Sequence, residues 1–193
     1  MNSDRLVQKY PPSQPCSCSI CLGYCRRPGW WTVEEAQKVI QAGLASRMML
    51  EISPEYSFGV LSPAFKGNEL TIAMQCYADN KCTFLTNDLC ELYGSGLQPL
   101  ECRFCHHDRP GQGDTCHRDI EEDWHTPPGQ RLVIQWCDLT NLWARLGLIK
   151  LGHGTLPGRT GVANLYQAGG LVETRNIQTG QHRRTRYHGG SNR

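Results

Sequence analysis

Cysteines dominate the chemistry that this sequence can perform. Eleven of its 193 residues are cysteine, and eight of these fall into two groups. Thiolates are preferred ligands of soft and borderline metals, and spacings of one to three residues let a short loop aim several of them at one centre. We therefore expect metal ligation by the first group, Cys16, Cys18, Cys21 and Cys25, and by the second group, Cys82, Cys90, Cys102 and Cys105.

Two kinds of metal centre fit eight thiols. A [4Fe–4S] cluster takes about four thiolates, and a structural zinc ion takes four ligands, so eight thiols could form two zinc sites. The thiolate-only character of the set favours an iron–sulfur cluster, with zinc as the alternative. Eight thiols at such spacings would rarely serve as core packing alone.

Histidines stand beside Cys105 and beside one further thiol, Cys116. The runs Cys105-His106-His107 and Cys116-His117 could extend the metal site or form a second one, because imidazole and thiolate together suit zinc. The alternative is that these histidines are ordinary polar residues of a loop rich in Arg, Gly and Asp. The sequence favours that alternative.

Hydropathy predicts the cellular location of the protein. The N-terminus has no apolar signal segment, and no stretch approaches eighteen consecutive apolar residues. We expect a soluble, cytoplasmic protein that does not bind membranes, in which tightly spaced cysteines hold metal rather than form disulfides.

The charge distribution divides the chain into a body and a tail. Residues 1–150 carry fourteen basic against seventeen acidic side chains, whereas residues 151–193 carry six arginines against Glu173 alone. We expect a metal-binding domain over 1–150 and a basic, Gly/Arg-rich extended tail over 151–193 that would be disordered on its own. Such a tail favours a protein partner or an oligomer, and nucleic acid is the less favoured alternative.

Local signals predict a small α+β fold. Thr32 and Glu35 form a capping box for a helix over 33–43, and Thr126 with Pro127 begins the longest helix, which apolar spacing extends over 129–146. Short strands are expected over 70–76, 82–85 and 89–94, and a helical turn after Pro99. Residues 109–123 are expected to be a loop that leads into an acidic stretch. The expected fold is therefore an irregular, metal-stapled α+β domain with a few helices.

Five motifs in residues 16–105 resemble the YkgJ-type cysteine-cluster family, described as a zinc- or iron-chelating domain. They are the cluster CSICLGYC at 18–25, the Thr-x-x-Glu helix start at 32–35, CTFL at 82–85, CELY at 90–93 and QPLECR at 98–103. Tyr24 stands where the family has the first cysteine of a doublet, Gln98 stands where it commonly has arginine, and Cys105 is an added thiol. The resemblance implies metal binding.

The functional hypothesis that follows is an iron–sulfur accessory protein, acting as an electron-transfer, assembly or maturation subunit of a larger enzyme. The alternative is a zinc-stabilised binding module whose basic tail contacts nucleic acid or an acidic protein surface. A stand-alone enzyme, such as a methyl transferase or redox enzyme, is the least favoured of the three. No Ser/His/Asp arrangement or phosphate-binding loop can be identified, and no catalytic residue is assigned.

Overall fold

The computed structural model describes residues 3–55, 57–73 and 81–145. Short helices and two small antiparallel sheets make up this part of the chain, which confirms the predicted α+β class. The helices are α1 (Ser3–Lys9), α2 (Ser19–Tyr24), α3 (Val33–Gln41), η1 (Ala45–Arg47), α4 (Leu100–Phe104), α5 (Gly113–Trp124), α6 (Pro127–Leu139) and α7 (Leu142–Arg145). The strands are β1 (Met48–Ile52), β2 (Gly59–Pro63), β3 (Leu85–Thr86) and β4 (Leu89–Cys90). The predicted tail, 151–193, lies outside the described residues.

The main sheet is the β1–β2 hairpin, in which Met48 pairs with Pro63 and Ile52 with Gly59. Every residue of β2 is buried. Its sequence therefore lacks the alternation of apolar and polar residues from which a strand is predicted. Helix α6 lies against this strand: Gln130 accepts from the Gly59 N–H and donates to the Gly59 carbonyl, both at 2.9 Å. A Cβ at Gly59 would approach Leu50 Cδ1 to 2.9 Å and Val133 Cγ1 to 3.3 Å, so a larger residue there would have to displace the buried Leu50 side chain.

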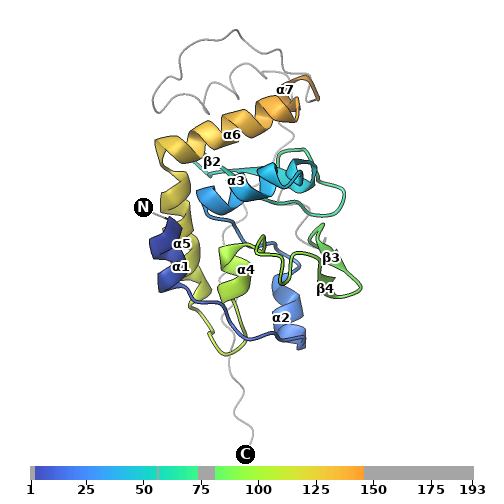
Figure 1. The fold of residues 1–193 in the computed structure, drawn as a ribbon, viewed down its shortest axis with the longest axis vertical. Helices are drawn as coiled ribbons and strands as arrows, with labels where there is room; N and C mark the ends of the chain where they lie inside the picture. The colour runs from blue at the N-terminus through green and yellow to red at the C-terminus, as the bar shows by residue number, and fades with distance from the viewer. Residues whose placement is uncertain (1–2, 56, 74–80, 146–193) are drawn as a thin grey trace, which may run out of the picture.

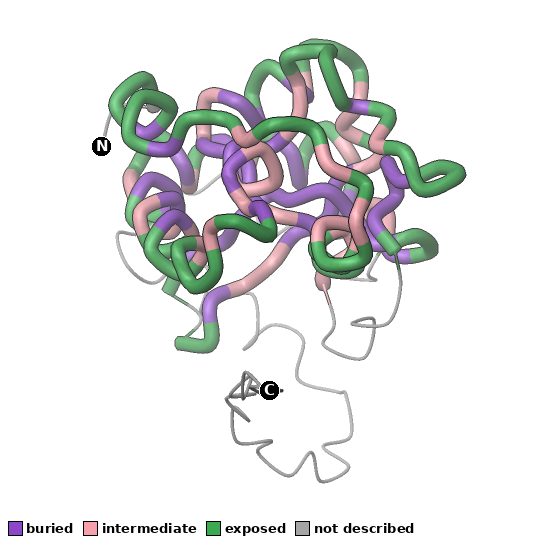
Figure 2. The backbone as a smooth tube through the Cα atoms, turned by 90° about the horizontal axis from the view of Figure 1, so that it is seen from below, coloured by how far each residue is buried: buried purple, intermediate pink, exposed green. Residues whose placement is uncertain are grey.

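Three fully buried tryptophans hold the core together. The indole N–H of Trp31 donates to the Leu97 carbonyl, that of Trp124 to the Trp31 carbonyl, and that of Trp136 to the Ala45 carbonyl, at 2.7–2.9 Å. Each ring thereby fills the interior and satisfies its one polar atom. Buried residues run through the centre of the molecule, and exposed loops surround them (Figure 2).

Two helical predictions need correction. The predicted loop over 109–123 is instead helix α5 from Gly113, because Cys116, Ile120 and Trp124 recur at four-residue spacing and are fully buried. The predicted single helix over 129–146 is divided: α6 ends at Leu139, Asn141 takes a positive φ of 54°, and α7 follows. Residue 146 lies outside the described part of the chain.

The strand predictions are confirmed only in part. Within 82–85 and 89–94 the structure has parts of the two-residue strands β3 and β4, which pair Leu85 with Cys90, and a single bridge between Cys82 and Phe65. The predicted strand over 70–76 gives a single bridge between Ile72 and Leu50 within its described residues, and 74–76 lie outside them.

Glu35 connects helix α3 to helix α4. Its carboxylate accepts from the Thr32 N–H at 3.1 Å, closing the predicted capping box, and from the Leu100 N–H at 3.0 Å. The same side chain pairs with the Arg103 guanidinium at 2.6 Å, and it is only 10% exposed. One buried carboxylate therefore fixes the start of α4 against the start of α3.

We expect Glu35→Ala to destabilise the fold far more than Glu34→Ala. Removing Glu35 leaves two backbone N–H groups without their acceptor and the Arg103 guanidinium without its carboxylate partner, which costs roughly 3 kcal/mol. Glu34 forms an exposed ion pair with Lys38, and such a pair contributes little to stability because solvent screens it. Urea unfolding followed by tryptophan fluorescence measures both changes, and equal losses in the two variants would contradict this role for Glu35.

Candidate metal centres

The N-terminal segment brings the first thiols to the loop that follows α4. The Ser13 N–H and hydroxyl both donate to the Arg103 carbonyl at 2.8 Å, and the Arg109 guanidinium donates to the Pro11 carbonyl at 2.8 Å. These bonds anchor a proline-rich stretch that cannot form helix or sheet pairing of its own. Cys16 lies at the end of this stretch, and Cys18 is the N-cap of α2.

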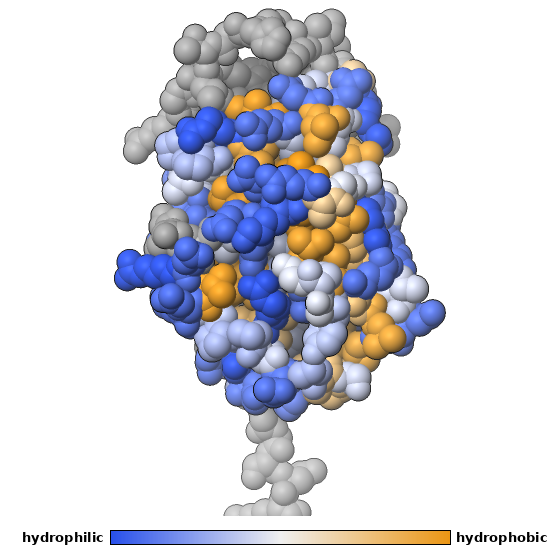
Figure 3. Space-filling model, in the orientation of Figure 1, coloured by the Kyte–Doolittle hydropathy of each residue, from blue (hydrophilic) through white to orange (hydrophobic). Residues whose placement is uncertain are grey.

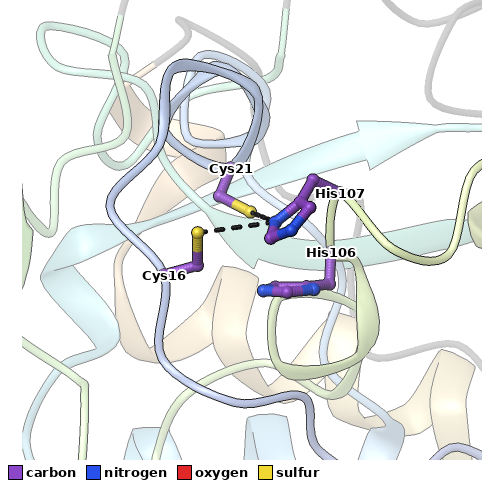
Figure 4. A group of neighbouring side chains, drawn as sticks. All are labelled: Cys16, Cys21, His106 and His107. Carbon is purple, nitrogen blue, oxygen red and sulfur yellow. Dashed lines mark hydrogen bonds between the residues drawn. The ribbon is translucent and has the colours of Figure 1, made fainter.

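Three thiols surround one nitrogen of His107. Its Nδ1 lies 3.4 Å from Cys16 Sγ, 3.5 Å from Cys21 Sγ and 3.7 Å from Cys18 Sγ. Figure 4 shows Cys16 on the loop before α2 and Cys21 on α2 itself, both directed at the His107 ring. Segments about ninety residues apart in sequence therefore meet at this nitrogen.

His106 contributes a second imidazole to the same group. Its Nδ1 bonds the Asp108 carboxylate at 2.6 Å, while its Nε2 is buried and has no hydrogen-bond partner. A buried polar atom without a partner is costly, and a carboxylate on the opposite nitrogen is the usual orienting partner of a metal-bound histidine. His106 is therefore set up to offer Nε2 as a ligand.

The four atoms from Cys16, Cys21, His106 and His107 lie within 4.8 Å of one another, a spacing that could hold a metal ion. With zinc–sulfur bonds of about 2.3 Å and zinc–nitrogen bonds of about 2.0 Å, a tetrahedron separates sulfur from nitrogen by roughly 3.5 Å. The measured distances from His107 to Cys16 and Cys21, 3.4 and 3.5 Å, agree with that value. We call these four residues the Cys/His group.

The thiols of α2 differ in acidity. The backbone N–H of Cys21 and the side chain of Cys16 lower the pKa of Cys18 to about 7, whereas burial raises the pKa of Cys21 to about 11. A thiol whose pKa lies near 7 is partly ionised at neutral pH and exchanges its proton for a metal readily.

We call Cys25, Cys82, Cys90 and Cys102, four of the remaining predicted ligands, the four-thiol group, because they lie close enough for the charge of one to raise the pKa of another. Burial raises the pKa of each, and the Cys90 thiolate adds to the effect at Cys25. The Cys82 N–H donates to the Cys25 carbonyl at 2.9 Å, so the end of α2 is joined to the strand that leads into β3.

Cys105 stands apart from the Cys/His group. It lies 3.1 Å from where a Cβ on Gly113 would be, and burial together with the Glu101 carboxylate raises its pKa to about 12. The prediction that Cys105 is a ligand is not supported by any converging set of donors in the described residues. Cys116 is fully buried in the core, and the His117 ring lies tilted against Trp30 and bonds Glu101 at 3.0 Å.

Sequence reasoning undervalued His106 and His107 as candidate ligands. We favoured loop histidines at these positions, whereas the structure places both beside the N-terminal thiols. The available signal was their position directly after a C-x-x-C pair, because mixed thiolate and imidazole ligands are typical of zinc sites. Their partners lie far away in sequence, so spacing alone could not select them.

Comparison with the models of known protein families, with curated proteins and with solved structures finds no match. The resemblance of residues 16–105 to the YkgJ-type family therefore stays a hypothesis that rests on its motifs. Within residues 3–55, 57–73 and 81–145, no helix has the length and apolar character needed to span a membrane.

We expect Gly29→Ala to disturb the four-thiol group. A Cβ there would lie 2.9 Å from the Cys102 nitrogen and 3.1 Å from its sulfur, so the backbone of α4 would have to shift, at a cost of about 1–3 kcal/mol. Gly23→Ala is the matched control, because nothing lies within 4 Å of its added Cβ. Thermal unfolding compares the two variants, and an equal effect would contradict the tight contact at Gly29.

Proposed function

We propose that this protein is a metal-binding module whose Cys/His group holds a zinc ion. The observation that carries the proposal is the convergence of two thiols and two imidazoles within 4.8 Å. Iron–sulfur clusters are held mainly by thiolates, whereas a mixed sulfur and nitrogen set is typical of zinc. This reverses, for this group, the preference for iron that the cysteines alone suggested.

The ligand count supports a structural rather than a catalytic ion. Four protein ligands fill a zinc tetrahedron, whereas catalytic zinc keeps one position open for water or substrate. An ion bound by Cys16, Cys21, His106 and His107 would join the N-terminal segment to the loop after α4. We therefore propose an accessory or binding module, and we assign no reaction to this group.

The partner of the module remains a proposal from the sequence. The six arginines of residues 151–193 favour contact with an acidic protein surface, and nucleic acid is the alternative. Several large apolar side chains of the described residues are also exposed, among them Ile20 and Tyr24 on α2 and Leu89 and Tyr93 around β4. Apolar atoms are visible between hydrophilic ones on the face shown in Figure 3.

Single substitutions in the Cys/His group should abolish high-affinity zinc binding. We expect His106→Ala, His107→Ala, Cys16→Ser and Cys21→Ser each to weaken zinc binding by more than about 100-fold, because each removes one of four ligands. Asp108→Asn should weaken it by roughly 10–100-fold, the range for an outer-shell partner. Competition against a chromophoric chelator measures these affinities.

Two controls make this measurement decisive. His125→Ala removes a histidine that stacks on Phe58, and Cys18→Ser removes the neighbouring thiol that is outside the Cys/His group. Both variants should keep zinc close to the parent affinity. Loss of zinc in Cys18→Ser together with retention in His106→Ala would replace our ligand set with a three-thiol set.

Removal of residues 153–193 should abolish capture of an acidic protein partner and leave zinc binding unchanged. Pull-down with the full chain and the truncated chain, followed by partner identification, tests this expectation. Binding of the full chain to RNA or DNA that weakens steeply with salt and vanishes on truncation would instead favour nucleic acid.

A further inference from the structure

The segment that joins α2 to α3 crosses helix α4 at residues 29 and 30. The Trp30 N–H donates to the Glu101 carboxylate at 2.7 Å, and the Glu101 N–H donates to the Trp30 carbonyl at 3.4 Å. The Gly29 N–H donates to Cys102 Sγ at 3.2 Å. Two pieces of chain that are 71 residues apart are therefore joined at this crossing, and the Glu101 side chain accepts the shortest of the three bonds.

His117 of helix α5 reaches the same carboxylate. Its Nδ1 lies 3.0 Å from Glu101 Oε1, while the Trp30 N–H donates to the other oxygen, Oε2. The imidazole ring also lies against the Trp30 indole, with ring centroids 4.0 Å apart and planes tilted by 38°. The indole Nε1–H of Trp30 donates to the Glu51 carboxylate at 2.8 Å. One side chain of α5 therefore contacts both halves of the crossing.

The contact between His117 and the crossing is partly buried. The His117 side chain is 29% exposed, the Glu101 side chain is 16% exposed, and Trp30 is buried. Water and salt screen an ion pair in this setting less than a pair on the surface. A cation within about 6 Å of an indole centroid is also attracted by the ring. The proton on His117 therefore decides whether the crossing holds an ion pair or a carboxylate beside a neutral ring.

Charges from three neighbouring segments act on His117. Glu101 on α4 and Glu51 on β1 favour the imidazolium, whereas Arg27, in the segment before α3, opposes it. Burial lowers the pKa of His117, but the hydrogen bond to Glu101 and the two carboxylate charges raise the pKa above its usual 6.5. The carboxylates therefore outweigh both burial and Arg27.

The other titratable groups around this site leave that balance in place. Helix α5 itself carries two acids and one base within about one turn of His117, namely Asp114, Glu121 and Arg118. The charge of Glu101 also reaches the thiols of Cys105 and Cys116, and burial raises the pKa of both, that of Cys105 to about 12. Both thiols are therefore neutral in the range where a histidine titrates.

We propose that His117 is a proton-operated clamp on the crossing of residues 29 and 30 over α4. As the imidazolium, His117 ties α5 to Glu101 and to the Trp30 ring at the same time. When the proton leaves for solvent, the neutral ring keeps an uncharged hydrogen bond to Glu101 at most, and the partly buried carboxylate loses its cation. The crossing is then held more weakly, and the Trp30 N–H opens to water more often.

The clamp acts on the attachment of α2. The crossing begins four residues after Cys25, the C-cap of that helix, and no residue of α2 is buried. A weaker crossing gives α2 more freedom, together with the exposed Ile20 and Tyr24. The folded chain holds the His117 proton more tightly than the unfolded chain. The stabilisation is therefore complete below a pH of about 6.5 and is lost as the pH rises through the folded pKa. No member of the clamp belongs to the Cys/His group, so the proposal does not rest on zinc.

The first test is a nuclear magnetic resonance titration of the histidine rings in the full chain. The pKa of His117 should lie above its usual 6.5, and Glu101→Gln should lower it, because glutamine keeps an acceptor for the Trp30 N–H but carries no charge. The control is His125, an exposed histidine whose ring stacks on Phe58. Its titration should not respond to Glu101→Gln. A His117 titration that Glu101→Gln leaves unchanged overturns the proposal.

The second test is hydrogen exchange of the Trp30 backbone N–H. Its protection factor should fall about fivefold to tenfold between a pH of about 6 and a pH of about 9, as a charged bond becomes a neutral one. In His117→Gln the protection should be lower at the acidic end and nearly constant with pH. The matched reference is the Val33 N–H, which donates to the buried Asp123 carboxylate at 2.8 Å. An equal fall at both amides of the parent chain, or no fall at Trp30, contradicts the clamp even if the variant does not fold.

Discussion

The position of α4 relative to α3 is the constraint on which both candidate centres depend. Glu35 binds the Leu100 N–H and Arg103, and Glu101 accepts from the Trp30 N–H at 2.7 Å. A five-residue helix cannot hold itself in place by its own hydrogen bonds, so these carboxylates hold it together with the burial of Leu100 and Phe104. Cys102 on this helix belongs to the four-thiol group, and His106 and His107 follow directly after it.

Helix α2 is the element that the two groups share. It spans six residues, and none of them is buried, so burial of apolar surface contributes little to its position. Cys21 of this helix faces His107, whereas Cys25 at its C-cap is joined to Cys82. In a chain with a modest apolar fraction, metal–ligand bonds can supply stability that a small hydrophobic core does not.

The sequence predicted the elements that carry their own local signals. Thr32 with Glu35 and Thr126 with Pro127 marked the starts of α3 and α6, because caps depend only on neighbouring residues. The β1–β2 hairpin was missed, because strands that are buried on both faces lack alternation. Helix α5 was missed because its acidic and turn-forming residues hid the apolar stripe of Cys116, Ile120 and Trp124.

The candidate site was likewise predictable from the sequence only where its signal is local. Thiol types and spacings indicated metal binding, and a cysteine/histidine cluster that could bind metal is present. Sequence spacing could not predict how the thiols divide between the two groups, because Cys21 and Cys25 are one helical turn apart yet belong to different groups. That division depends on His107 and Cys82, which other segments bring to opposite ends of α2.

If a metal bound at both groups, α2 would make the two sites depend on each other. A helix of six residues without a buried face gains most of its order from whatever holds its ends. Occupation of the Cys/His group would fix Cys21, and through less than two turns of helix it would limit the positions open to Cys25. Cys25 would then be preorganised toward Cys82, Cys90 and Cys102, and less ordering entropy would oppose binding at the four-thiol group. By linkage the effect is reciprocal, so a metal at either group favours a metal at the other.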